Sequence, residues 1–135
     1  MMKHRAERHL MLWYGMRLTL VVAAVLCTAC SGPADPPVPL ASGQYTFQHR
    51  YAEHPTMPSM RVTVTVQGNH ITVTNPVAAD PFPAGDIAEG QLMWHGASAQ
   101  WIISEDDADR LVQDVGGCSD GPEVVDLEEK IYWTC

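Results

Sequence analysis

Alternating apolar and polar residues mark the clearest local structure in this chain. In RVTVTVQGNHITVTNP, residues 61–76, aliphatic residues recur at every second position and threonines fill most of the positions between them. This period of two predicts two β-strands. Gly68 and Asn69 suit a two-residue primed turn, in which Gly takes a positive φ. The register then places all the aliphatic side chains on one face, with His70 beside the turn on the polar face. It pairs Gln67 with His70, Val66 with Ile71, and Val64 with Val73.

The same period of two predicts further strands. GQYTFQHRYAE, residues 43–53, is typical of a half-buried strand, and GQLMWHGASAQWIIS, residues 90–104, of a second hairpin with its turn at residues 96–98. EVVDLEEKIYWTC, residues 123–135, indicates two short strands around Glu128 and Glu129, whereas residues 75–90 are expected to form a long loop. The chain should therefore be mostly β, a small antiparallel barrel or sandwich of seven short strands with one short helix.

The expected helix lies in SEDDADRLVQDVGG, residues 104–117, where the alternation breaks. Ser104 is the expected N-cap, Asp107 would complete a capping box, and Gly116 would end the helix. The apolar residues expected to face the sheet are Leu111 and either Val112 or Val115. The acids at residues 105–109 could also suggest a calcium loop, but Leu111 occupies the place of a third ligand. Helix capping therefore explains these acids better.

The first thirty residues differ in character. An uncharged apolar stretch, residues 18–29, follows the basic residues Lys3, Arg5, Arg8 and Arg17. A membrane-spanning helix needs about twenty apolar residues, so this stretch is too short to cross a bilayer. Its length and its basic flank are those of the apolar region of a signal peptide.

The residues that end this stretch resemble the lipobox of bacterial lipoproteins. In LCTAC, residues 26–30, Ala29 and Cys30 match the small residue and the modified cysteine, whereas Cys27 departs from the usual aliphatic residue. The resemblance implies a lipoprotein signal peptide over residues 1–29 and lipid attachment at Cys30. Ser31 replaces the Asp that often retains such lipoproteins in the inner membrane. The family rule therefore implies a protein anchored in the outer membrane through its N-terminal lipid, with its domain facing the periplasm.

Residues 30–42 are rich in proline and small residues, and they predict a semi-rigid polyproline tether before a β-domain at residues 43–135. A domain of this size has a small core and benefits from a covalent staple. Cys118 and Cys135 remain after Cys27 leaves with the signal peptide and Cys30 is acylated, and in an oxidising compartment they are expected to form a disulfide. A metal site or a redox pair would normally show C-x-x-C spacing, which these two cysteines lack.

Charge restricts the class of partner. From Cys30 onward the chain has four basic and fifteen acidic residues, a net charge of −11. Nucleic-acid binding depends on Lys and Arg that neutralise phosphates, so this balance argues against it. It would suit a cationic partner or a divalent cation, although a solubilising surface is the more ordinary interpretation of such a charge.

Motifs for catalysis are missing from the sequence. There is no G-x-S-x-G, P-loop or dinucleotide fingerprint, and His49, His54, His70 and His95 form no H-x-x-x-H pair. The sequence therefore predicts no enzyme, no metal site and no cofactor. The expected loop at residues 75–90 and the second hairpin supply the candidate binding residues. They are Phe82, Trp94, His95 and Trp101.

A small, tethered, acidic β-domain with a disulfide resembles periplasmic lipoprotein inhibitors and immunity proteins, the membrane-bound lysozyme inhibitors among them, at the level of architecture. The resemblance implies a non-catalytic binding module, an inhibitor or immunity protein for a basic periplasmic hydrolase. Two alternatives stay open, a lipocalin-like carrier of a small apolar ligand and a structural envelope lipoprotein.

Overall fold

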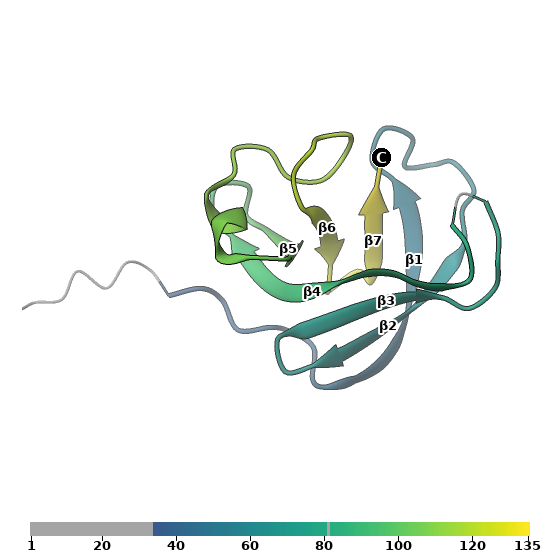
Figure 1. Cartoon of the computed structure of the whole chain (residues 1–135), viewed down its shortest axis with the longest axis horizontal. Helices are drawn as coiled ribbons and strands as arrows, with labels where there is room; N and C mark the ends of the chain where they lie inside the picture. Colours follow the sequence, from purple (N-terminus) through teal and green to yellow (C-terminus); the bar gives the residue numbers. More distant parts are fainter. Residues whose placement is uncertain (1–33, 81) are drawn as a thin grey trace, which may run out of the picture. The chain divides into compact units, whose positions relative to one another are not determined.

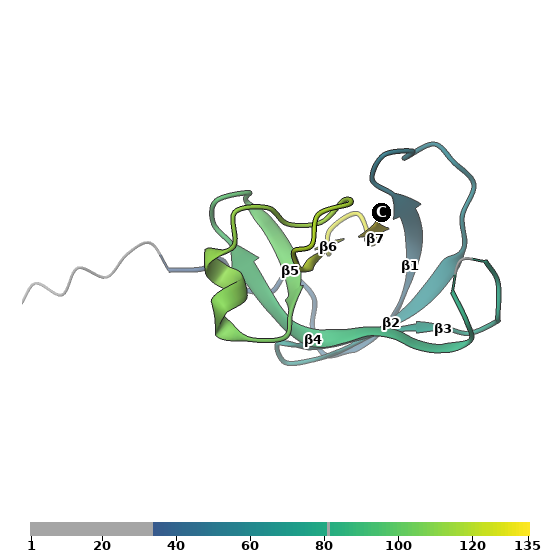
Figure 2. The same cartoon turned by 45° about the horizontal axis from the view of Figure 1, so that its top comes forward.

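The computed structural model describes residues 34–80 and 82–135, which form a closed barrel of seven β-strands (Figures 1 and 2). The elements in chain order are β1 Gly43–Tyr51, β2 Arg61–Gln67, β3 His70–Asn75, β4 Gly85–His95, β5 Gln100–Ser104, the 3-10 helix η1 Asp107–Leu111, β6 Glu123–Asp126 and β7 Ile131–Thr134. The predicted signal peptide, the lipobox and Cys30 lie outside the described residues.

Each strand pairs with the next one along the chain in antiparallel fashion, and a parallel pairing of β1 with β7 closes the barrel. The predicted fold class, mostly β with a barrel as one of its two forms, is confirmed. The β2–β3 hairpin has the predicted register, with Val66 opposite Ile71 and Gln67 opposite His70. Gly68 adopts a φ of 65°, as a primed turn requires.

The interior of the barrel is filled by its own side chains. Phe47 of β1 and Tyr132 of β7 are fully buried, and the aliphatic face of the β2–β3 hairpin packs against them. That face consists of Val62, Val64, Val66, Ile71 and Val73. The threonines that alternate with these residues are half-buried on the opposite face, as the period of two predicts.

A second apolar cluster lies on the outer face of β4, β5 and β6. Met93, Ile102 and Val124 form it, and Val115 and Trp133 pack against it. Val115 belongs to residues 112–122, between η1 and β6, which cover this side of the barrel and which we call the covering segment. At Gly116, φ is 64° and a Cβ atom would lie 2.7 Å from Val124 Cγ2, so only glycine fits this close approach.

The prediction for the helix is wrong in its detail. The helix is a five-residue 3-10 turn, and its capping box joins Asp106 with Asp109 instead of Ser104 with Asp107. Leu111 does not face the sheet, because 86% of its surface is exposed. The backbone becomes extended at Val112, so the helix ends before Gly116. Of the expected apolar contacts, that of Val115 is present.

The long loop predicted at residues 75–90 is shorter in the structure. Residues Gly85 to Glu89 belong to β4, where they pair with β3 across a bulge between Val73 and Thr74. This part of β4 lacks the alternation of a strand in the sequence, and its conformation comes from pairing with β3, which satisfies its backbone N–H and C=O groups. The connection between β3 and β4 is therefore residues 76–84.

The domain begins before the predicted boundary at Gly43. Asp35–Cys135 form one compact unit. Val38 and Leu40 pack against the core, and Asp35 Oδ2 lies 2.6 Å from Arg110 Nη1. The second half of the predicted tether, residues 35–42, is thus part of the folded unit, because its two aliphatic side chains find apolar surface to cover.

Candidate functional site

Two of the predicted binding residues are less accessible than expected. Phe82 is half-buried, and its ring meets the ring of His49 edge to face at 5.2 Å. His95 is fully buried, with Nδ1 2.8 Å from Ser98 Oγ and Nε2 2.9 Å from the Val112 carbonyl oxygen. His95 therefore anchors the covering segment to the barrel, and its position does not allow direct contact with a partner.

The two predicted tryptophans come together at one end of the barrel. Trp94 and Trp101 are opposite each other on β4 and β5, and their rings meet at 5.5 Å with an interplanar angle of 66°. They line a groove of about 240 Å³, which also involves Trp133 of β7 and the turn between β6 and β7. We call this the rim groove, defined by Trp94, Gln100, Trp101, Asp126, Glu128 and Trp133.

A second and larger groove has a volume of about 430 Å³ and lies between β4, η1 and the residues that lead into β6. Of the described residues that line it, six are acidic and none is Lys, Arg or His. We call it the acidic groove, defined by Glu89, Glu105, Asp106, Asp109, Asp120 and Glu123. The sequence shows the acids at residues 105–109, but only the fold brings Asp120 and Glu123 to them.

The carboxylates of the acidic groove have different roles. Asp106 Oδ1 accepts a hydrogen bond from the Ala108 N–H, and Asp109 Oδ2 accepts one from the Glu105 N–H, so both cap η1. Glu89 Oε1 lies 3.0 Å from His70 Nε2. Among the described residues, Glu105 and Asp120 have no side-chain hydrogen bond or ion pair of their own. These two carboxylates are therefore the ones most available to a ligand.

Glu123 links the acidic groove to the core. Its Oε2 accepts a hydrogen bond of 2.6 Å from the Tyr132 hydroxyl. Burial raises the pKa of the Glu123 carboxyl above its ordinary value, and the hydrogen bond from Tyr132 lowers it by a smaller amount. Burial also raises the pKa of Tyr132, which therefore remains a donor at neutral pH.

His49 forms a polar cluster at another place in the barrel. The ring is fully buried, its Nδ1 contacts Ser59 Oγ, and its Nε2 lies 2.8 Å from Thr134 Oγ1. Two hydroxyls without a carboxylate do not form the usual relay of a hydrolase. Burial lowers the pKa of His49, and the charge of Arg50 lowers it further. The arrangement joins β1, β7 and the connection that follows β1.

The buried, neutral His49 predicts that stability falls in mild acid. The unfolded chain binds a proton at His49 near pH 6.5, whereas the folded protein does so only at lower pH, so this contribution is present above about pH 6.5 and is lost below it. The slope is at most about 1.4 kcal/mol per pH unit. Urea unfolding between about pH 7.5 and 5 measures it.

The matched variants for this measurement are His49→Gln and His54→Gln, since His54 is exposed. We expect His49→Gln to flatten the fall and His54→Gln to keep it. The raised pKa of Glu123 acts in the opposite direction, because protonation of that carboxyl in acid favours the folded state, but this effect is common to all three proteins. An unchanged slope in His49→Gln would contradict the prediction.

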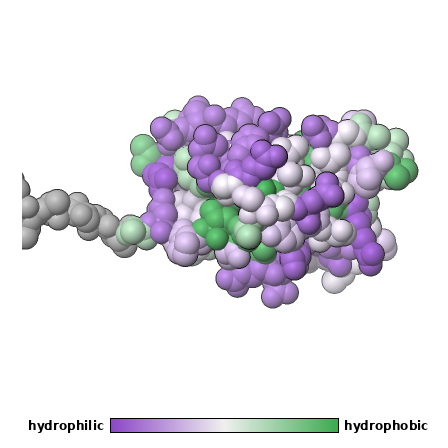
Figure 3. All heavy atoms as spheres, turned by 90° about the horizontal axis from the view of Figure 1, so that it is seen from below, coloured by the Kyte–Doolittle hydropathy of each residue, from purple (hydrophilic) through white to green (hydrophobic). Residues whose placement is uncertain are grey.

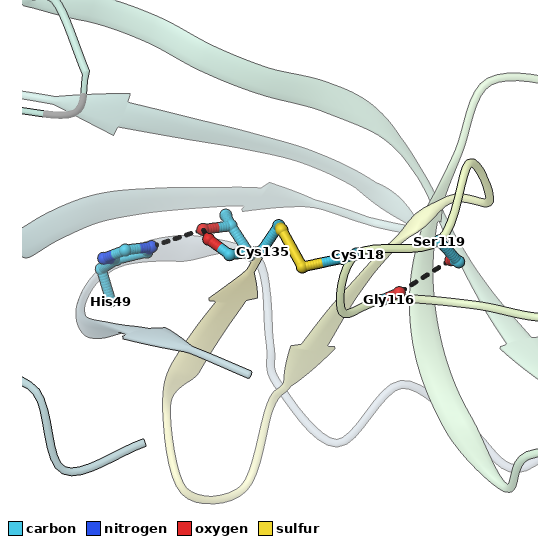
Figure 4. The surroundings of a disulfide bond; sticks show 6 residues. His49, Gly116, Cys118, Ser119 and Cys135 are labelled. Carbon is cyan, nitrogen blue, oxygen red and sulfur yellow. Dashed lines mark hydrogen bonds between the residues drawn. A yellow bond between two sulfur atoms is a disulfide. The ribbon is translucent and has the colours of Figure 1, made fainter. Parts of the chain in front are cut away.

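The predicted disulfide between Cys118 and Cys135 is present, with the Cα atoms 4.5 Å apart. Figure 4 shows that it ties the covering segment to the end of β7, close to the hydrogen bond between His49 and Thr134. On the other side, Ser119 Oγ donates a hydrogen bond of 2.7 Å to the Gly116 carbonyl oxygen. The disulfide thus holds the segment that supplies Val115 to the outer cluster.

Within residues 34–80 and 82–135, no three His, Cys, Asp or Glu side chains converge in a way that would hold a metal ion. In the same part of the chain, no helix has the length and apolar character to cross a membrane. Comparison with protein-family models, with curated proteins and with solved structures found no match to this chain. Its function must therefore be argued from its own grooves and charges.

Proposed function

We propose that this protein is a non-catalytic binding module that captures a basic protein of the bacterial envelope, as the inhibitor or immunity protein of a cationic hydrolase. In this proposal the lipid at Cys30 anchors it in the outer membrane, with the domain facing the periplasm. The observation that supports the proposal most directly is the acidic groove, a concave surface whose lining, among the described residues, has six carboxylates and no basic side chain.

The arrangement of the acids favours an extended cationic surface over a single metal ion. A metal ion needs several oxygen ligands within about 2.0–2.6 Å, and no such group exists among the described residues. Separate carboxylates along a groove suit several Lys and Arg side chains of a protein. The net charge of −11 from Cys30 onward would also speed the encounter with a cationic partner.

The exposed apolar surface points in the same direction. The face drawn in Figure 3 is mostly hydrophilic, with hydrophobic residues in small groups. In residues 34–80 and 82–135, the large exposed apolar side chains are Met57, Val77 and Leu111, which come from three different segments. Small groups of exposed apolar residues are normal for the surface of a folded protein. Recognition through charge is therefore better supported than recognition through apolar contact.

The carrier alternative would require a cavity of several hundred Å³ inside the barrel. The interior is occupied by Phe47, Tyr132, Leu127 and the aliphatic face of the β2–β3 hairpin. None of these residues exposes more than 1% of its surface. The two grooves described above are open to solvent. No observation on the barrel therefore favours a carrier.

The test measures binding of a cationic lysozyme to the full chain in detergent micelles. We expect the double substitution Glu105→Gln/Asp120→Asn to weaken binding at least about tenfold, because it removes the two carboxylates without partners. Lysozyme with acetylated lysines should bind much more weakly, and affinity should fall steeply between about 0.05 and 0.3 M salt. Calorimetric titration gives the dissociation constants.

The matched control is Glu53→Gln/Asp80→Asn, which removes the same charge from exposed positions outside both grooves. We expect this control to change the dissociation constant less than about threefold. Equal weakening by both pairs would mean that net charge alone attracts lysozyme, and the acidic groove would not be the binding site. Lack of binding at low salt would remove the proposal of an inhibitor.

A further inference from the structure

The rim groove lies where the ladder between β5 and β6 ends. The last paired residues on this side are Trp101 and Val125, so Gln100 and Asp126 continue beyond the ladder without pairing to each other. Both residues line the groove, together with Trp94 and Trp133. A position at the end of a barrel, between rigid strands, is a common place for a ligand site.

Three indole rings line this small space. Trp94 and Trp101 meet edge to face and therefore do not cover each other's faces completely. Trp133 packs with one side against the outer cluster of Met93, Ile102 and Val124 and also lines the groove. The face of an indole ring attracts a cation more strongly than that of any other aromatic side chain.

Two carboxylates complete the groove. Asp126 Oδ1 accepts hydrogen bonds from the N–H groups of Glu128 and Glu129, which form the turn between β6 and β7. Among the described residues, Asp126 Oδ2 and the Glu128 carboxylate accept no hydrogen bond, and the ion pairs there join other residues. No Lys or Arg is among the residues of the described part of the chain that line the groove. The groove therefore offers negative charge beside aromatic faces and has no cation of its own.

We propose that the rim groove binds the guanidinium group of an arginine side chain, stacked on the indole rings and hydrogen-bonded to Asp126 and Glu128. Arginine fits this chemistry better than lysine, because its flat, delocalised cation stacks on an aromatic face and presents a fork of N–H donors to carboxylates. The inference deepens the proposed function, since it names a side chain that a basic partner would insert, at a groove separate from the acidic one.

The test uses a small probe, N-acetyl-arginine amide, titrated into the full chain in detergent micelles. The indole N–H signals of Trp94, Trp101 and Trp133 are followed by NMR. We expect these signals to shift, and the dissociation constant to be at least about tenfold weaker for N-acetyl-citrulline amide, which has nearly the same shape without the charge. Substituting Asp126→Asn/Glu128→Gln should weaken arginine binding at least about fivefold, while the amide oxygen introduced at position 126 keeps the acceptor that the turn needs.

The control is the acidic-groove variant Glu105→Gln/Asp120→Asn, which should bind the probe within about twofold of the natural chain, because its charges are outside the rim groove. Unshifted indole signals, equal binding of citrulline, or equal weakening in the control would overturn the proposal. If N-acetylglucosamine shifts the same signals and arginine does not, the groove is a carbohydrate site and the proposal is wrong. These results are independent of lysozyme capture, so either proposal can fail without the other.

Discussion

Replacing Tyr132 by alanine is expected to lower the free energy of unfolding by about 3–5 kcal/mol, the usual cost of removing a large aromatic side chain from a core. Tyr132 has no exposed surface and is the largest fully buried side chain among the described residues. Its ring packs near those of His49 and Phe82, with centroids 5.9 and 6.5 Å away. Urea unfolding at pH 7 measures the change.

The variant Tyr132→Phe separates packing from hydrogen bonding. It keeps the ring and removes the hydroxyl that donates to Glu123, so we expect a loss of about 1–2 kcal/mol. Without this donor, the half-buried Glu123 carboxylate is less well satisfied, and the pKa of Glu123 should rise further. A loss below about 1 kcal/mol in Tyr132→Ala would show that the barrel does not depend on this side chain.

The parts of the fold that could be predicted are those determined by local periodicity. In β2 and β3 the side chains alternate between the two faces of the sheet, so Val64 and Val73 had to share a face once the turn at Gly68 was recognised. The first residues of β4 could not be predicted in this way. Gly85 and Asp86 are poor strand formers, and they join the sheet because β3 offers them hydrogen-bonding partners.

The helix shows why capping residues alone do not determine a helix. Asp106, Asp107 and Asp109 are all able to cap, so the sequence permits several starting positions within a few residues. The position realised depends on where the chain must turn to cover the barrel. The Val112 carbonyl oxygen is bonded to the buried His95 ring instead of to a following helical turn. A contact of this kind joins residues 17 apart in sequence and leaves no local signal.

Within one hairpin the sequence indicates which side chains lie near each other, whereas groupings made by closure of the barrel or by the covering segment leave no local signal. Trp94 and Trp101 face each other through the register of the β4–β5 hairpin. Trp133 enters the same groove only because β7 closes the barrel next to β6. Asp120 likewise joins the acids near η1 through the path of the segment before β6. Such groupings are properties of the tertiary structure.

Removal of the disulfide is expected to lower the free energy of unfolding by about 3 kcal/mol. Cys118 and Cys135 are 17 residues apart. A cross-link that closes a loop of this size lowers the conformational entropy of the unfolded chain and so raises its free energy by about that amount. The bond also holds the covering segment, so its loss would weaken the contact of Val115 with the outer cluster. Urea unfolding of Cys118→Ser/Cys135→Ser, compared with the natural chain, measures the change.

The matched control for this prediction is the natural chain with reductant present throughout unfolding. Reduction should lower its stability towards that of the double variant, and reductant should leave the double variant unchanged. Without the disulfide, the covering segment, which carries Asp120 of the acidic groove, is held less firmly. We therefore also expect faster amide hydrogen exchange at residues 112–122 in the double variant, whereas the β2–β3 hairpin stays protected. Equal stability with and without reductant would mean that packing of the covering segment, and not the covalent bond, stabilises this side of the barrel.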